Sequence, residues 1–237
     1  MLYSTPERGN TRAHGKILTC LVMLALTCSV TLPAFGADQY KDESTLRDAA
    51  HVLDEMFKSN NIPPDLITKA VCVIVMPGVK KFGLGVGGSG GRGPMSCRKG
   101  ANFKGKWSTP AMYTIASVSA GLQVGGSSTD YVLLVMDQKG LNEILKGKTK
   151  LGANVSASAG PGATTAGTPG GDILTYAHST KGLFAGASLS GASIEEDHDA
   201  NTRLYGQSVA AQSIVKGNTV KTTDAGQPLV TLLNSKT

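Results

Sequence analysis

Basic side chains gather in one stretch of the sequence that contains no acidic residue. Between Asp65 and Asp130 there is no Asp or Glu. The candidate binding residues in this stretch are Lys69, Lys80, Lys81, Arg92, Arg98, Lys99, Lys104, Lys106 and Trp107. Each Lys or Arg near an anionic bilayer contributes about 1 kcal/mol, so several on one face predict reversible binding to a membrane or another anionic ligand. The alternative is that these are solvated loop charges and that Trp107 packs in the core instead of anchoring at an interface.

The residues of nucleophilic catalysis are not arranged in a recognisable motif. Beyond residue 36 the histidines are His51, His178 and His198, and no serine elbow of the G-x-S-x-G type lies near them. We therefore expect no enzymatic activity and no catalytic residues.

Two further motifs resemble ligand sites only in part. Gly83-x-Gly85-x-x-Gly88 has the form of a dinucleotide fingerprint, but the residues 89–94 that follow cannot open the helix that would bind the pyrophosphate. The acidic run 195–199 lacks the spaced oxygen ligands and the glycine of a calcium loop. We expect no cofactor and no metal.

The first 36 residues have the layout of a secretory signal peptide. The basic residues Arg8, Arg12 and Lys16 precede an apolar run over 17–30, and a small-residue motif follows at 34–36. The apolar run is shorter than the roughly 20 residues of a spanning helix, so we expect cleavage after Gly36. An uncleaved anchor and lipid attachment at Cys28 are the alternatives. The predicted location is the periplasm or cell envelope, peripheral to a membrane.

Export would place Cys72 and Cys97 in an oxidising compartment, where a disulfide is one interpretation of the pair. The other is two separate buried thiols, because Cys72 lies in an apolar run. The whole chain has a formal charge of +6, the mature chain would be only mildly basic, and we expect no nucleic-acid partner.

Periodicity predicts the elements that position the basic residues. Residues 42–58 have the spacing of an amphipathic helix, which we expect to pack on a sheet, and a short helix should begin at Pro64 or Asp65. Val71–Met76 and Tyr131–Met136 are unbroken apolar runs that predict buried strands, the first at the centre of a sheet.

Glycine-rich segments between these runs predict tight bends and closely packed strands. They cover residues 82–91, 113–126, 150–160 and 181–194. A turn at 137–140, a short helix at 141–146 and a final helix at 200–215 follow from the remaining pattern. We expect one α+β domain over residues 37–217, with a strongly curved, mainly antiparallel sheet or small barrel packed by N-terminal and C-terminal helices, and a C-terminal tail over 218–237.

Several segments, in this order along the chain, resemble the SYLF domain family. They are Ile62-Pro63-Pro64, Gly83–Gly91, Trp107-Ser108-Thr109-Pro110, 121–125 with Asp130, 151–162, 176–189, and Asp199 to Asn201 with Tyr205-Gly206. Residues 176–189 are the most specific piece, because they resemble the family's Y-s-x-s-K-G-L-F-A-G-x-S-L. The resemblance covers nearly the whole mature chain.

This resemblance implies an α+β fold and binding to acidic phospholipids, which are phosphoinositides in eukaryotic members. Residues 94–97 depart from it, because they stand where we expect an apolar strand to continue. The expected partner is an anionic phospholipid membrane, and no actin is expected behind a signal peptide. The alternative is a structural or protein-interaction module of the cell envelope, with envelope proteins as partners and no direct lipid binding.

Overall fold

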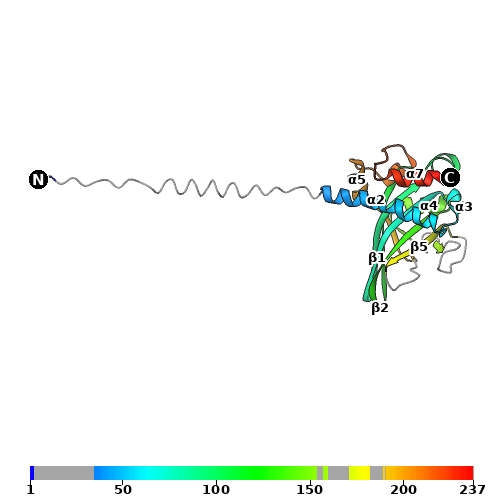
Figure 1. Ribbon diagram of the computed structural model, residues 1–237, viewed down its shortest axis with the longest axis horizontal. Coiled ribbons are helices and arrows are strands. Elements are labelled where there is room, and N and C mark those ends of the chain that lie inside the picture. The colour runs from blue at the N-terminus through cyan, green and yellow to red at the C-terminus, as the bar shows by residue number, and fades with distance from the viewer. Residues whose placement is uncertain (3–34, 154–156, 160–170, 182–188, 190, 237) are drawn as a thin grey trace. The chain divides into compact units, whose positions relative to one another are not determined.

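The computed structural model describes residues 1–2, 35–153, 157–159, 171–181, 189 and 191–236 (Figure 1). Residues 35–237 form one compact unit. Most of the predicted signal peptide, residues 3–34, lies outside the described residues, as do parts of the family-like segments 151–162 and 176–189, namely 154–156, 160–162 and 182–188. The elements are α2 (Phe35–Lys58), α3 (Pro64–Lys69), β1 (Cys72–Cys97), η1 (Ala101–Phe103), β2 (Ala111–Val135), α4 (Gln138–Leu145), β3 (Thr149–Lys150), β4 (Ala157–Ala159), β5 (Ile173–Lys181), β6 (Ser193–Glu196), α5 (His198–Tyr205), α6 (Ala211–Lys216) and α7 (Gln227–Ser235).

Helix α2 is amphipathic and packs on the sheet. Leu46, Ala49, Leu53 and Met56 recur at helical spacing and are all buried. This face contacts β1 and α7, which confirms the predicted packing, although the helix begins at Phe35 and not at Asp42. Among the described residues, no helix combines the length and apolar character needed to cross a membrane.

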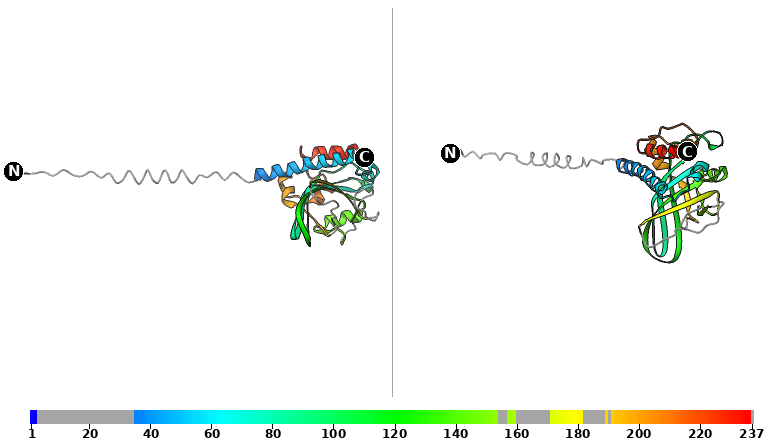
Figure 2. Two further views of the ribbon diagram at one scale, coloured as in Figure 1. Left: turned by 60° about the horizontal axis from the view of Figure 1, so that its bottom comes forward. Right: turned by 45° about the vertical axis from the view of Figure 1, so that its right-hand side comes forward.

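Strands β1 and β2 form a long ribbon that folds back on itself. They pair from Cys72 with Val135 to Met95 with Ala111. Yet the two ends of β1 are neighbours, because the Cα atoms of Cys72 and Cys97 are 4.0 Å apart and Arg98 N donates to the Val71 carbonyl at 2.9 Å. Strand β1 therefore reverses near its register shift at residues 84–86, and β2 follows the same path. Both strands run outward and return in Figure 2.

Glycine allows the two halves of β1 to come so close. A Cβ atom added to Gly93 would lie 1.8 Å from the Val75 carbonyl oxygen, and one added to Gly91 would lie 2.8 Å from Val79 Cγ2. Any side chain at these positions would force the halves apart. The predicted close packing of glycine-rich strands is confirmed.

The remaining strands extend the sheet from the outer edges of β2. Strand β5 pairs antiparallel with one end of β2 and β6 with the other. Strand β3 joins β6 antiparallel, whereas β4 joins β5 in parallel. The result is the predicted α+β domain with a strongly curved, mainly antiparallel sheet.

Helices cover both faces of the sheet. Alternate residues of β1 enter two different apolar clusters: Ile74 and Met76 pack with α4 and α6, while Val73 and Val75 pack with α2, α3 and α7. In Figure 2, α2 and α7 lie on one side of the sheet and α4 lies on the other. The start of β1, residues 72–76, is thus buried on both faces, as predicted.

Three local predictions need correction. Asp137 is not in an isolated turn but caps α4, since its side chain accepts from Gly140 N at 2.7 Å. The predicted final helix is two helices, because Gly206 ends α5 in a left-handed conformation with φ of 68°. The segment after residue 217 is more than a polar tail, since Leu229, Val230 and Leu233 of α7 are buried against α2. The compact domain therefore continues to the C-terminus.

Candidate functional site

The densest group of predicted binding residues lies on one hairpin, residues 98–107, which we call the basic hairpin. Lys99 N donates to the Lys106 carbonyl at 3.0 Å, and Arg98 pairs with Trp107 across it. Gly105 is required at the turn, because a Cβ there would lie 2.5 Å from the Lys99 carbonyl oxygen. The disulfide between Cys72 and Cys97 fixes the strand that leads into the hairpin.

Arg98 is used to build this hairpin. Its guanidinium donates to the carbonyls of Thr68 at 3.1 Å, Gly105 at 3.4 Å and Lys104 at 3.4 Å. Its charge also lies 5.7 Å from the centre of the Trp107 ring. Arg98 therefore has a structural role in the hairpin, and its contact with a ligand stays a prediction.

Trp107 packs in the core, which was the alternative to an interfacial anchor. Its side chain is 3% exposed within the cluster formed by α2, α3 and α7. Its backbone N donates to Asn234 Oδ1 at 3.2 Å, which connects the hairpin to the end of α7.

The lysines around the basic hairpin differ in how they are paired. Lys69 forms an ion pair with Asp65 at 2.9 Å, and Lys99 Nζ donates to Asn218 Oδ1 at 2.5 Å. Lys104 and Lys106 are exposed, and within the described part of the chain neither ammonium group has an ion pair or hydrogen bond. These two charges are therefore available to an anionic ligand.

Arg92 lies away from the hairpin, in a charge network that holds the helices to the sheet. Its guanidinium is 2.8 Å from Asp42 and 3.5 Å from Asp197, and Arg203 Nε is 2.6 Å from Asp42. Asp42 is fully buried, and its hydrogen bond to Arg203 raises the pKa of that guanidinium. Arg92 thus connects β1 to α2 and α5, and it is a poor candidate for a lipid ligand.

Lys80 and Lys81 lie on the outward-running half of β1, paired with Ser128 and Ser127 of β2. Successive residues of a strand face opposite sides, so at most one of the two can face a given ligand. Lys80 is exposed and Lys81 is half-buried, and Lys80 has no ion pair among the described residues. Lys80 lies about 25 Å along the strand from Cys72, at about 3.3 Å per residue, so it is remote from the basic hairpin.

The acidic run 195–199 has structural partners. Glu195 pairs with Lys148 at 3.6 Å, Glu196 accepts from Ala211 N at 2.7 Å, and Asp197 caps α5 by accepting from Ala200 N at 3.0 Å. These contacts position the first turns of α5 and α6. In the described residues, no three His, Cys, Asp or Glu side chains form a group that could hold a metal ion.

A serine, a histidine and a carboxylate do meet beside this run, which the sequence motifs did not reveal. His198 Nε2 is 3.1 Å from Ser208 Oγ, and Nδ1 is 3.7 Å from Glu196 Oε1. The His198 side chain is 56% exposed, and Glu196 Oε1 already accepts from Ala211 N. Because this group is exposed to solvent, it lacks the low-dielectric environment that strengthens electrostatic catalysis. That the protein has no enzymatic activity stays a prediction.

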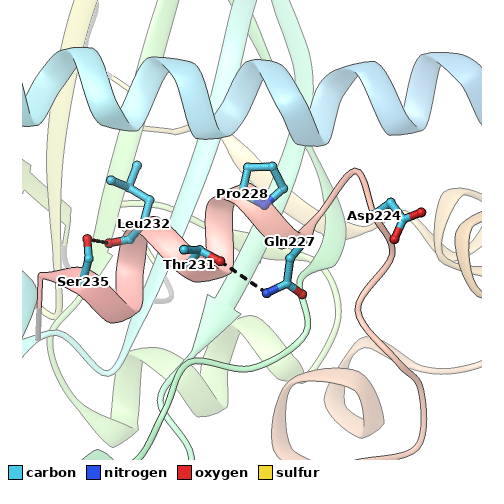
Figure 3. A pocket seen from close by; sticks show the side chains of 6 residues that line it. All are labelled: Asp224, Gln227, Pro228, Thr231, Leu232 and Ser235. Carbon is cyan, nitrogen blue, oxygen red and sulfur yellow. Dashed lines mark hydrogen bonds between the residues drawn. The ribbon is translucent and has the colours of Figure 1, made fainter.

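Two surface pockets adjoin the helices. One, of about 660 Å³, lies beside α7 and is lined by Asp224, Gln227, Pro228, Thr231, Leu232 and Ser235 (Figure 3). Polar side chains that line this pocket form hydrogen bonds within α7. Gln227 Nε2 donates to Thr231 Oγ1, and Ser235 Oγ donates to the Leu232 carbonyl. Asp224 is its one charged lining residue, and a carboxylate repels an anionic headgroup.

The second pocket, of about 440 Å³, lies between α4 and α6 and includes Lys139, Lys146 and Lys216. Lys139 is 3.3 Å from Asp172, and Lys146 is 2.5 Å from Glu143. Because two of its three lysines already have carboxylate partners, this pocket attracts an anion less than the exposed lysines of β1 and the basic hairpin do.

The fold and these surfaces define a class of protein: a single α+β domain with a folded β-ribbon and unpaired surface lysines. A family model described as "Ysc84: Las17-binding protein actin regulator" matches residues 116–236. The chain belongs to this Ysc84 (SYLF) family, as its sequence motifs indicated.

Relatives in fungi and animals support the assignment. The chain is 33% identical over 208 residues to Protein YSC84 of Saccharomyces cerevisiae. The aligned region covers 82% of this chain and 43% of the yeast protein. It is 32% identical over 208 residues to LAS seventeen-binding protein 3 of the same species, covering 82% and 44%. For the human SH3 domain-containing YSC84-like protein 1 the identity is 30% over 203 residues, covering 83% and 58%. The chain therefore spans less than half the length of the yeast relatives, and no solved structure matches it.

Proposed function

We propose that this protein is exported and binds anionic phospholipid headgroups of a membrane through its exposed lysines. The observation that carries the proposal is that Lys80, Lys104 and Lys106 are exposed and have no ion pair among the described residues, in a stretch without a carboxylate. Unpaired ammonium groups attract anionic lipid without first having to lose an internal partner. The disulfide supports export, because disulfides persist in oxidising compartments.

The test is sedimentation of the purified protein with vesicles of increasing phosphatidylserine content. Binding should rise with anionic lipid and fall with salt, because charges near a surface are screened within about 10 Å at 0.1 M salt. Each lysine that contacts the bilayer contributes about 1 kcal/mol, so affinity should fall about fivefold for each contacting lysine lost in K80Q/K104Q/K106Q. Equal binding to zwitterionic and anionic vesicles would refute the proposal.

A matched control uses lysines that already have carboxylate partners. K69Q/K139Q/K146Q removes the same net charge, but each of these ammonium groups is neutralised by Asp65, Asp172 or Glu143. This variant should bind vesicles nearly as wild type does. An equal loss in both variants would mean that overall charge, and not the unpaired lysines, drives the interaction.

The second candidate function is a protein-interaction module of the cell envelope. The family description names Las17 binding and actin regulation, and one yeast relative is named for Las17 binding, which favours a protein partner of some kind. Cross-linking in envelope extracts followed by detergent wash separates the two functions, since a protein complex survives detergent and a bilayer contact does not. We expect no actin partner for an exported chain, and actin co-sedimentation tests that expectation.

A further inference from the structure

The outward half of the β1–β2 ribbon, residues 80–91 and 115–128, has one bare face. We call this half the arm. Its exposed residues alternate along the strands and therefore share one face: Lys80, Phe82, Gly90, Ala116, Val118 and Gly126. Phe82 is 66% exposed and Val118 is 86% exposed.

This face continues the surface that the helices cover nearer the disulfide. Val73 and Val75 are buried under α2, α3 and α7, and Arg92 reaches α2 through its ion pair with Asp42. Beyond these residues the ribbon projects past the helices, as Figure 1 shows. The large apolar side chains of the arm therefore have no helix over them.

Phe82 and Val118 are next to each other on the arm. A Cβ atom added to Gly88 would lie 3.7 Å from the Phe82 ring, and Gly88 pairs with Val118 in the strand register. The two side chains thus flank the same glycine. Lys80 is on the same face. The carboxylate nearest to it along the ribbon is Asp130, two residues from its register partner Ser128, but Asp130 is 5% exposed and accepts from Gly78 N at 2.7 Å.

We propose that the arm inserts Phe82 and Val118 into the interfacial layer of an anionic bilayer while Lys80 binds a headgroup. This proposal rests on the proposed lipid-binding function and adds the residues and the depth of the contact. Apolar side chains beside a cationic one are the combination with which peripheral proteins enter the headgroup boundary.

A bilayer fits this surface better than a protein partner does. A stable protein interface buries about 800 Å² on each side and depends on shape complementarity. In the described part of this face, the other exposed apolar positions are Gly90, Ala116 and Gly126, which offer few side chains for a rigid partner to recognise. A fluid lipid surface adapts to a projecting pair of apolar side chains and needs no such complementarity.

The experiment places a fluorescent reporter at the arm of the full-length exported protein. Trp107 is the chain's single tryptophan and is buried, so it provides a constant background. In Phe82→Trp, vesicles of phosphatidylserine and phosphatidylcholine should shift the emission to shorter wavelength, and brominated acyl chains should quench it. Tyr40→Trp is the matched control, because Tyr40 is 70% exposed on α2, outside the arm, and it should show neither change.

Affinity gives a second readout. Phe82→Ala should bind the same vesicles about tenfold more weakly, because the variant loses the apolar surface that the interface buries in wild type. Its thermal unfolding should match that of wild type, since the side chain is mostly exposed. K80Q should weaken binding more than K104Q/K106Q, because Lys104 and Lys106 are in the basic hairpin, outside the arm.

The outcomes separate the two proposals. Quenching of Phe82→Trp alone, with weaker binding of Phe82→Ala, supports the arm. If wild type binds anionic vesicles but Phe82→Trp is not quenched, or Tyr40→Trp is quenched in its place, the arm is wrong and headgroup binding stands. If wild type binds no vesicles, both proposals are overturned. Both are also overturned if the fluorescence of Phe82→Trp changes only on binding a protein partner that survives detergent.

Discussion

At the scale of single residues, two buried carboxylates connect elements that are distant in sequence. Asp42 is fully buried between Arg92 and Arg203, and Asp130 is 5% exposed beside Gly78. A buried charge is tolerated when partners compensate its lost hydration, so each carboxylate makes its neighbourhood depend on those partners.

Replacing Asp42 with asparagine should destabilise the protein. The change leaves Arg92 and Arg203 without their shared carboxylate, and because both guanidinium groups keep some exposure we expect a loss of about 2 kcal/mol, less than for a fully buried pair. Urea unfolding measures it. Asp48→Asn, at an exposed position of the same helix, should leave the midpoint nearly unchanged, and a similar loss in both variants would contradict the role of the network.

Asp130 should make stability depend on pH. Burial raises the pKa of its carboxyl above the ordinary value of 3.8, although its hydrogen bond from Gly78 N opposes this. Because the folded pKa is the higher one, the contribution is fully present below the ordinary pKa and is lost as pH rises through the folded pKa.

Asp130→Asn keeps an oxygen that accepts from Gly78 N but cannot ionise. Its stability relative to wild type should therefore improve as pH rises from about 3 to about 7, measured by urea unfolding at each pH. A stability difference that stays constant over this range would mean that Asp130 has the same pKa in the folded and unfolded chain.

At the scale of elements, the folded ribbon is the unusual feature. Strand β1 reverses without a long loop, and its two ends are joined by the disulfide, by the bond from Arg98 N to Val71 and by glycines that allow close approach. The basic hairpin begins where this junction ends. Its lysines therefore keep a fixed position only while the junction holds.

Replacing Cys72 and Cys97 with serine should lower the free energy of unfolding by about 3 kcal/mol, the value expected for closing a loop of this order; the sequence separation is 25. Denaturant unfolding with and without reductant measures the effect. Reductant should destabilise wild type by a similar amount and leave the double variant unchanged. If the free energy of unfolding of wild type stays the same after the disulfide has been fully reduced, the bond does not stabilise the fold.

At the scale of the whole molecule, the sheet is covered by helices from the start and from the end of the compact unit's sequence. Helix α2 near its start and α7 near its end pack against each other over one face of β1. Helix α7 also connects to the basic hairpin through Asn234 and Trp107. The last twenty or so residues therefore complete the same core that the first helix begins.

A chain that ends at residue 217 should not fold cooperatively. It loses the buried side chains of Leu229, Val230 and Leu233, which together contribute about 5 kcal/mol, comparable to the total stability of about 5–15 kcal/mol of a typical domain. Thermal unfolding by circular dichroism tests this, with Leu233→Ala as an intermediate case expected to lose about 2–4 kcal/mol. A sharp, wild-type transition in the truncated chain would restore the boundary at 217.

The sequence by itself determined the fold class, the family and the longest local elements. The apolar spacing of α2 and the unbroken runs at the start of β1 and the end of β2 specify their elements because burial follows the period of each structure. The glycine-rich segments correctly indicated close strand packing. The acid-free stretch identified the candidate lysines, but it could not separate Lys80, Lys104 and Lys106 from Arg92 and Arg98.

Only the tertiary structure decided which charges are paired, because the partners are distant in sequence. Arg92 forms an ion pair with Asp42 of α2, whereas Arg98 donates hydrogen bonds to carbonyls of α3 and of its own hairpin. The exposure of Phe82 is also a tertiary property, since the same alternation buries Val73 and Val75 where helices lie over the ribbon. Whether an apolar residue of a strand is core or surface depends on what packs above it, and strand periodicity carries no information about that.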